Sequence, residues 1–224
     1  MNTYSTSSSM QALIERRLKL FKHYKINLLF DVGANTGGYG QIMRKFGFQG
    51  RIVSFEPLCS AFKKLREKVA NDSLWQVENF ALGNREGKLK INVSKNSVSS
   101  SILEMLQLVT NVAPEAGYIG SEEIKIYRLD DVFHRYYKAG NSVFLKIDTQ
   151  GYEKKILKGA VKSLKNITGL QVETSLVPLY EGETLMHDMV RFIKKLGYTM
   201  MSIEPGFHNP ATGQLLQADL IFFK

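Results

Sequence analysis

The chain has 224 residues, of which 44% are hydrophobic and 23% are charged, and its formal net charge is +9. This length and composition are typical of one globular α/β domain. The single cysteine, Cys59, excludes an internal disulfide, which indicates a reducing compartment.

The amino-terminal residues are polar, and they lack the apolar core of a secretory signal. No apolar run approaches the roughly 18 residues that suggest a membrane span. We therefore expect a leader and one helix over residues 1–25, a single domain over residues 26–224, and a cytoplasmic location.

Helical and strand patterns alternate along the rest of the chain. Apolar residues at helical spacing predict a helix over residues 10–24. The main strands are expected over residues 26–32, 51–55, 75–79, 143–147 and 170–172, and helices over residues 38–46, 57–70, 129–137, from 153 onward and 184–196. Pro57 fits the first turn of its helix. This alternation predicts a doubly wound, mostly parallel sheet with helices on both faces.

Shorter elements complete the expected order. Extra strands are predicted over residues 89–93 and 124–127, and closing strands over residues 198–203 and 220–223. Residues 96–120 are the least regular part, with a short helix expected over residues 102–108. A connection of this length inside a domain predicts a functional lid or a mobile segment.

The first strand ends in a turn that is typical of nucleoside-binding sheets. Asp31 and Gly33 follow an apolar run, Gly37 opens the next helix, and Glu56 ends the second strand 23 positions after Gly33. Gly33 lets the backbone turn sharply, and the helix amino terminus favours a negative group. Glu56 lies near the offset at which an acid reaches a ribose hydroxyl.

Asn35 decides which cofactor this turn favours. A dinucleotide fingerprint needs glycine there, because the backbone must touch a pyrophosphate. S-Adenosylmethionine has no pyrophosphate, and it suits the turn if Asp31 takes its ammonium and Glu56 accepts from its ribose. A nicotinamide-dependent oxidoreductase is the alternative enzyme class, and a plain strand-to-helix turn is the alternative without a ligand.

A second polar motif ends the strand over residues 143–147. Lys146 and Asp148 are two positions apart, so they point to the same side of that strand. Burying both is costly unless they are paired or used in chemistry. We expect Asp148 beside the transferring methyl group and the acceptor hydroxyl, with Lys146 holding an acceptor oxygen or tuning Asp148. A structural ion pair is the alternative.

Two further residues are rival candidates for the catalytic base. Glu173 ends the strand over residues 170–172, and it can bind the acceptor or act as the base. His187 suits base chemistry by residue type, although its place beside an apolar stripe favours an exposed surface position. Asp148 and Glu173 offer carboxylates to a hard cation. No third compelling ligand accompanies them, so we expect no metal.

The net charge of +9 has two interpretations. It can attract an anionic acceptor such as a nucleotide sugar, a phosphoglycan or a nucleic acid. It can also reflect a solvated surface, which the scattered distribution of lysine and arginine favours. No basic block is interleaved with aromatic residues, so we do not expect a nucleic-acid partner.

Taken together, these motifs resemble the FkbM family of methyltransferases from about Ile26 to the carboxyl terminus. The resemblance rests on six blocks in the family's order, which are Phe30-Asp31-Val32-Gly33-Ala34-Asn35-Thr36-Gly37, Phe55-Glu56-Pro57, Asn79-Phe80-Ala81-Leu82-Gly83, Ser99-Ser100-Ser101, Leu129-Asp130-Asp131 and Leu145-Lys146-Ile147-Asp148-Thr149-Gln150-Gly151-Tyr152-Glu153. It implies a class I, Rossmann-like methyltransferase fold with seven strands, of which the last is antiparallel.

The resemblance also implies S-adenosylmethionine as donor and O-methylation of a small molecule or glycan: a sugar, a glycolipid or a polyketide-like compound. By resemblance, the cofactor contacts Gly33 and Asn35 at its methionine end, Glu56 at its ribose and Phe80-Ala81 at its adenine. Asp31, Gly37, Pro57, Asn79 and Asp148 come from the same blocks, and we include them in the expected cofactor site. Family members often carry Val-Glu-Gly where this chain has Thr149-Gln150-Gly151, a departure that concerns acceptor preference. RNA methylation and a non-catalytic nucleic-acid module are the remaining alternatives.

Overall fold

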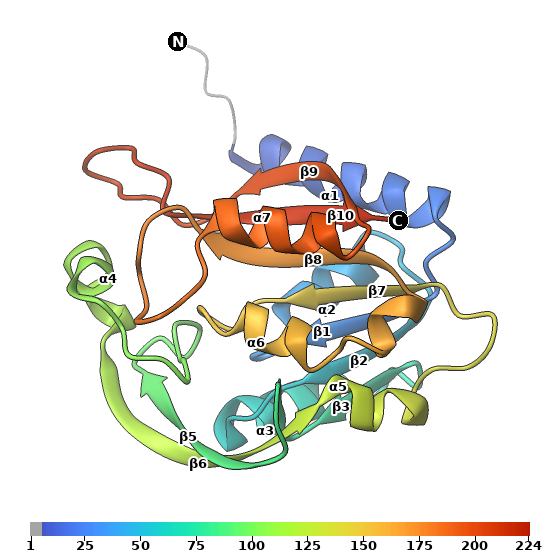
Figure 1. Ribbon diagram of the computed structural model, residues 1–224, viewed down its shortest axis with the longest axis horizontal. Coiled ribbons are helices and arrows are strands. Elements are labelled where there is room, and N and C mark those ends of the chain that lie inside the picture. Colours follow the sequence, from blue (N-terminus) through green and yellow to red (C-terminus); the bar gives the residue numbers. More distant parts are fainter. Residues whose placement is uncertain (1–5) are drawn as a thin grey trace.

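The computed structural model describes residues 6–224, so the start of the expected leader lies outside the described residues. One seven-stranded sheet runs through the molecule in the order β3-β2-β1-β7-β8-β10-β9 (Figure 1). Its strands are β1 (Leu28–Val32), β2 (Arg51–Phe55), β3 (Trp75–Glu78), β7 (Val143–Ile147), β8 (Ile167–Ser175), β9 (Thr199–Pro205) and β10 (Gln217–Phe223). Only β10 runs antiparallel to both of its neighbours, which confirms the expected class I methyltransferase architecture.

Helices cover both faces of this sheet, so its central strands are buried on both sides. All five residues of β1 and of β7 are buried. The α-helices that belong to this main sheet are α1 (Thr6–His23), α2 (Gly38–Lys45), α3 (Cys59–Lys68), α5 (Leu129–Val132), α6 (Glu153–Lys158) and α7 (Met186–Lys195). One apolar core contains side chains of α1 and α2, and the other contains side chains of α5, α6 and α7. In the described part of the chain, no helix has the length and apolar character needed to cross a membrane.

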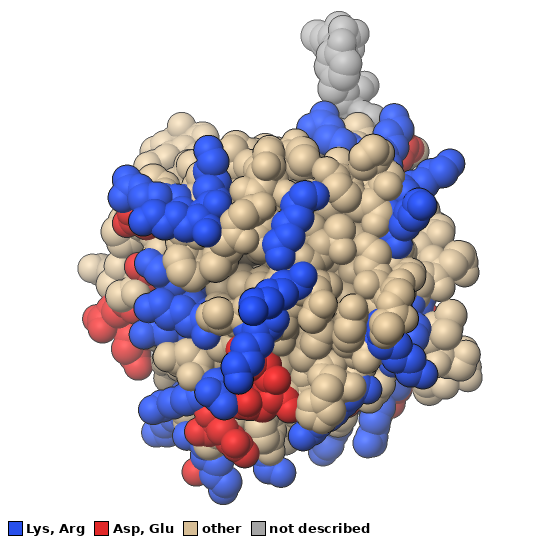
Figure 2. Space-filling view, turned by 45° about the vertical axis from the view of Figure 1, so that its right-hand side comes forward, with Lys and Arg blue, Asp and Glu red and all other residues tan. Residues whose placement is uncertain are grey.

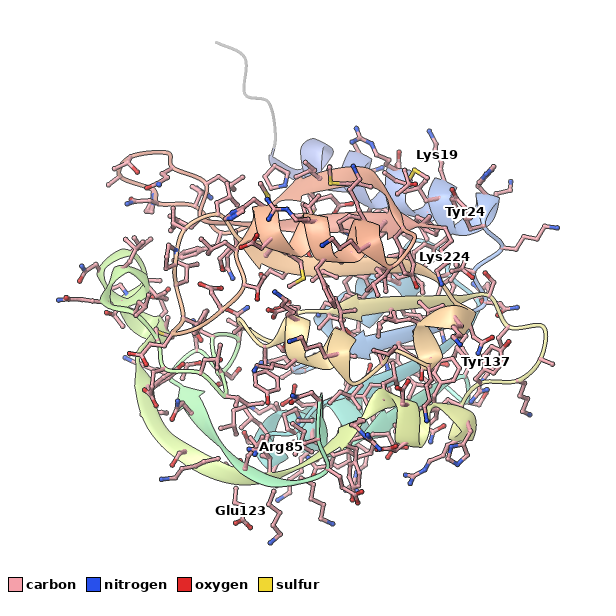
Figure 3. All side chains as sticks on the ribbon, in the orientation of Figure 1. Lys19, Tyr24, Arg85, Glu123, Tyr137 and Lys224 are labelled. Atoms are coloured by element: carbon pink, nitrogen blue, oxygen red, sulfur yellow. The ribbon has the colours of Figure 1, made fainter. Side chains whose placement is uncertain are left out.

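The amino-terminal helix is anchored at the carboxyl end of the chain. The ring of Tyr24, just after α1, stacks on Phe223 of β10 with 4.1 Å between centroids. Figure 3 shows Tyr24 and Lys224 close together on this side of the molecule. Stacked aromatic pairs add to the free energy of area burial, so the contact fixes α1 against the sheet.

A smaller structure extends from the sheet, and the sequence predicted it only in part. It holds a three-stranded sheet of β4 (Ala81–Gly83), β6 (Tyr118–Arg128) and β5 (Gly87–Ser94), together with α4 (Gln107–Val112). The helix expected over residues 102–108 was wrong, because Met105 instead bridges to Tyr180 and the helix starts later. The strand expected over residues 124–127 extends back to Tyr118 because β5 pairs along nearly its whole length.

Two further expectations are corrected by the strand and helix boundaries. Pro57 precedes its helix, which begins at Cys59 because the extended Leu58 occupies the cap position. Glu173 lies inside β8 rather than after it, because pairing with β10 extends β8 to Ser175. The turns after β1, β2 and β7 nevertheless meet at one edge of the sheet, as expected for parallel strands.

Gly33 is required at this edge by direct contact as well as by its backbone angle. Its φ is +74°, and a Cβ there would lie 1.8 Å from the carbonyl oxygen of Asp148. Gly213 offers a matched control, since its φ is +75° and a Cβ there would meet no atom within 4 Å. The two glycines therefore separate backbone strain from steric overlap.

We expect Gly33→Ala to lower the melting temperature far more than Gly213→Ala. Left-handed backbone costs an alanine roughly 1–2 kcal/mol, which is about 2–8 °C in a domain of this size. Only Gly33→Ala adds a collision with the turn after β7. Thermal unfolding followed by circular dichroism measures both variants, and equal shifts would contradict the close approach seen in the structure.

Candidate active site

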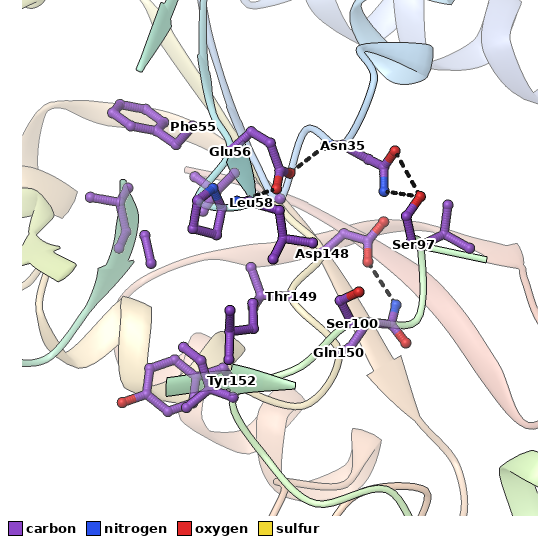
Figure 4. Close-up of a pocket in the computed structure, with 18 residues that line it drawn as sticks. Asn35, Phe55, Glu56, Leu58, Ser97, Ser100, Asp148, Thr149, Gln150 and Tyr152 are labelled. Carbon is purple, nitrogen blue, oxygen red and sulfur yellow. Dashed lines mark hydrogen bonds between the residues drawn. The ribbon is translucent and has the colours of Figure 1, made fainter. Parts of the chain in front are cut away.

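A pocket opens where the turns after β1, β2 and β7 meet (Figure 4). It encloses about 680 Å³ of space, counting open solvent at its mouth. Its walls come from the turn after β1, the end of β2, β4 and β5, the irregular segment after β5, and the turn after β7. We call it the first pocket. It contains six of the residues expected to bind the cofactor: Gly33, Asn35, Glu56, Pro57, Ala81 and Asp148.

Glu56 is oriented by two backbone donors. The N–H groups of Asn35 and Leu58 donate to its carboxylate at 2.7 and 2.9 Å. Burial raises the pKa of Glu56 to about 7, although these two hydrogen bonds oppose the shift. A carboxylate has about four lone-pair sites, so two remain for outside donors. The group therefore fits the paired hydroxyls of a ribose.

The rest of the first pocket suits a flat, mostly apolar ring. The apolar residues Phe55, Pro57, Ala81 and Ile91 line it. Gly37, Asn79 and Phe80, which were also expected to bind the cofactor, do not line it. They support it from behind: Gly37 caps α2, the Asn79 amide donates to the carbonyls of Glu56 and Pro57, and Phe80 packs on Phe55.

Asn35 connects the cofactor turn to the irregular segment. Its backbone φ is +47°, in the left-handed region. Its side-chain amide donates to the hydroxyl of Ser97 at 3.1 Å, and Ser97 is itself at φ +61°. The segment expected to be a lid thus already lies over the first pocket in this structure.

Three charged side chains occupy the ends of β1 and β7. The ammonium of Lys146 lies 3.3 Å from Asp31 and 3.3 Å from Asp148. Burial alone would lower the pKa of Lys146, but the two carboxylates outweigh it and raise that pKa. Lys146 also donates to the carbonyl of Gly33 at 3.4 Å. It therefore holds the two strand ends together and stays protonated.

Asp31 requires a correction. It was expected to accept the ammonium of the cofactor, yet it has no exposed surface and does not line the first pocket. Its carboxylate is used by Lys146 and by the hydroxyl of Ser54 at 3.3 Å. Asp148, whose side chain is 34% exposed, is the member of the group that reaches the pocket.

A second pocket of about 740 Å³, counting open solvent, adjoins the first. The two share Val98, Asp148 and Gln150, so Asp148 faces both. Glu173 lines the second pocket only. Burial, followed by repulsion from Asp148 and Asp219, raises the pKa of Glu173 well above its usual range.

Gln150 joins these acids, and the sequence interpretation missed this role. Its amide nitrogen donates to Asp148 at 2.9 Å and to Glu173 at 2.6 Å. Its amide oxygen accepts from the hydroxyl of Tyr180 at 2.7 Å. The local signal is its place two residues after Asp148, but Tyr180 comes from a distant loop that no local pattern connects to it.

His187 is placed away from both pockets. Its side chain is 66% exposed on α7, where it lies 3.3 Å from Asp188. It therefore has no contact with Asp148 or Glu173 in this structure. Among the residues that the structure describes, no group of three or more potential ligands is arranged to hold a metal ion.

Comparison with known proteins finds one matching protein family and a similar methyltransferase. Residues 31–200 match the family model described as the methyltransferase FkbM domain. Methyltransferase sdnD from Sordaria araneosa is 28% identical over 153 residues, which are 58% of this chain and 59% of that protein. The match therefore spans about three fifths of the curated relative.

Solved structures resemble the fold at low identity. A precorrin-6y C5,15-methyltransferase from Geobacter metallireducens is 12% identical, with a TM-score of 0.49 over 100% of this chain and 92% of that one. An rRNA methylase from Streptococcus thermophilus is 9% identical, with a TM-score of 0.44 over 89% and 87% of the two chains. At these values neither structure bears on the choice of acceptor.

We expect Lys146→Met to lower the free energy of unfolding by about 3–5 kcal/mol, because it leaves buried carboxylates without a counter-charge. Lys158→Met, on the exposed surface of α6, is the matched control and should change it by less than about 0.5 kcal/mol. Urea unfolding at neutral pH measures both. Adding Asp31→Asn to Lys146→Met should recover part of the loss, and no recovery would show that the ion pair does not cause it.

Proposed function

The chain belongs to the FkbM family of methyltransferases, and we propose that it transfers the methyl group of S-adenosylmethionine to a hydroxyl oxygen of a sugar, glycolipid or polyketide-like small molecule. The position of Asp148 is the single observation that carries this proposal. Asp148 lies at the junction of two pockets, where the pocket lined by the expected cofactor residues meets a second pocket that we assign to the acceptor.

The residues of the first pocket fit the donor. Glu56 has free lone pairs for the ribose hydroxyls, and the apolar slot beside Phe55, Ala81 and Ile91 suits an adenine ring. The turn at Gly33 and Asn35 lies where the amino-acid end would bind. When bound, S-adenosylmethionine supplies an electrophilic methyl group on a sulfonium that is already a good leaving group.

The task of the protein is then to position the acceptor and to remove its proton. Asp148 accepts the hydroxyl proton as the acceptor oxygen forms its bond to carbon. Lys146 and Gln150 hold the Asp148 carboxylate in place from two sides. Such orientation contributes several kcal/mol to a barrier, and proton transfer to a positioned base contributes about 10²–10⁴-fold in rate.

We expect Asp148→Asn to reduce methyl transfer by about 10²–10⁴-fold, since the amide cannot take the proton. Binding of S-adenosylhomocysteine should persist, which separates lost chemistry from lost folding. The assay is radiolabelled methyl transfer to fractionated glycans, lipids and small hydroxylated metabolites. Asp188→Asn, on the exposed surface of α7, is the control that should keep the original rate. Wild-type turnover by Asp148→Asn would remove Asp148 as the base.

We also expect binding of S-adenosylhomocysteine to strengthen as the pH rises through about 7. Ribose hydroxyls donate to a carboxylate, and Glu56 has a pKa of about 7, so half of it is protonated at that pH. Below this value the affinity should fall by up to about tenfold per pH unit, and above about pH 8 it should level off.

Glu56→Gln removes the titrating group. It should weaken S-adenosylhomocysteine binding at pH 8 by about 10–100-fold, the value of a hydrogen bond to a charged group, and should flatten the pH dependence. Calorimetric titration at several pH values measures both effects. A variant that keeps the same pH profile would show that another group is responsible.

A further inference from the structure

The second pocket has an apolar wall that belongs to neither core of the main sheet. Val109, Ala116, Leu179 and Tyr180 form a separate buried cluster, and Phe207 packs against it from the connection between β9 and β10. All five line the second pocket. An apolar wall of this kind favours a ligand with an apolar body of its own.

The second pocket is also lined by polar groups, and three of these are acidic side chains. Asp148, Glu173 and Glu115 line it together with the amides of Gln150 and Gln217. Gln150 and Gln217 donate to the same oxygen of Glu173, at 2.6 and 3.0 Å. Among the described residues that line this pocket, there is no lysine, arginine or histidine.

The ammonium of Lys146 does not give the second pocket a positive group for an anion. Lys146 is buried, does not line the second pocket, and lies between the carboxylates of Asp31 and Asp148. The raised pKa of Glu173, caused by burial and then by Asp148 and Asp219, shows that the site already disfavours one more negative charge. A phosphate or carboxylate on the ligand would meet the same repulsion.

The net charge of +9 does not argue for an anionic ligand at this site. Figure 2 shows lysine and arginine side chains spread from one end of a face to the other, with fewer acidic residues among them. These side chains contribute to the field around the molecule, whereas recognition of a bound anion requires donors within contact distance.

We propose that the second pocket binds an uncharged alcohol with an apolar body. Its hydroxyl is placed toward Asp148, and its apolar side lies against the apolar wall that includes Phe207. This inference rests on the proposed function and narrows it. Acceptors that carry phosphate or carboxylate beside the reacting hydroxyl, nucleic acids included, are excluded from the pocket.

Charge fractionation tests the proposal directly. A metabolite extract of the source cells is passed over an anion exchanger, and the unretained material is divided on a reversed-phase column. Each fraction is then incubated with the intact chain and S-[methyl-³H]adenosylmethionine. We expect label in the fraction that the anion exchanger does not retain and the reversed-phase column does.

The other outcomes are also decisive. Label confined to the material retained by the anion exchanger, or to material that neither column retains, would overturn the inference and leave the proposed function intact. Absence of label from all fractions, with S-adenosylhomocysteine still bound, would overturn the proposed function and this inference with it.

A pair of variants tests the apolar wall. Phe207→Ala should raise the KM for the labelled acceptor about tenfold, the effect of losing part of a buried aromatic contact. Phe46→Ala, at another half-buried phenylalanine outside both pockets, is the matched control and should leave KM unchanged. Affinity for S-adenosylhomocysteine should be unaffected in both variants. Equal KM values in the two variants would overturn the placement of the acceptor against this wall.

Discussion

One buried ammonium holds together the two strand ends that form the rim of both pockets. Lys146 of β7 is the direct neighbour of Asp31 in β1, and its charge also reaches Asp148 just beyond the strand. Burying the charges of Lys146 and Asp31 is tolerable only because they compensate each other, and Asp148, which is 34% exposed, adds a second carboxylate to the ammonium. The same contacts bring the turn at Gly33 against the backbone of Asp148, so that the two halves of the site become one rim. The pairing of β1 with β7 therefore also fixes the geometry of the site.

The smaller structure beside the sheet completes what that rim begins. Ser97 meets Asn35 at the cofactor turn, and the hydroxyl of Ser101 donates to the carbonyl of Gln150 at 2.7 Å. One irregular segment thus touches the turns after both β1 and β7. Val98, which lies between these contacts, belongs to both pockets. Five residues of chain, Ser97 to Ser101, therefore link the two turns and contribute to the lining of both pockets.

The sequence predicted the parts of this arrangement that are local. Apolar runs that end in an acid located Asp31, Glu56 and Asp148 at the sheet edge, because strand burial and strand direction follow from short patterns. It failed where a contact joins distant segments. The role of Asp31 as a partner of Lys146, rather than of the ligand, depends on which side chains remain exposed after packing. The start of α4 depends on a bridge between Met105 and Tyr180, which are 75 residues apart.

Gln150 shows why such contacts matter chemically. A carboxylate at this position would place a third negative group against Asp148 and Glu173, and only a bound cation or additional protons could relieve the repulsion. An amide instead donates to both acids and still accepts from Tyr180. Its backbone φ of +55° is costly for a residue other than glycine, and the surrounding hydrogen bonds offset that cost. The junction between the pockets is thus held by an uncharged residue, and the Asp148 side chain beside it remains 34% exposed.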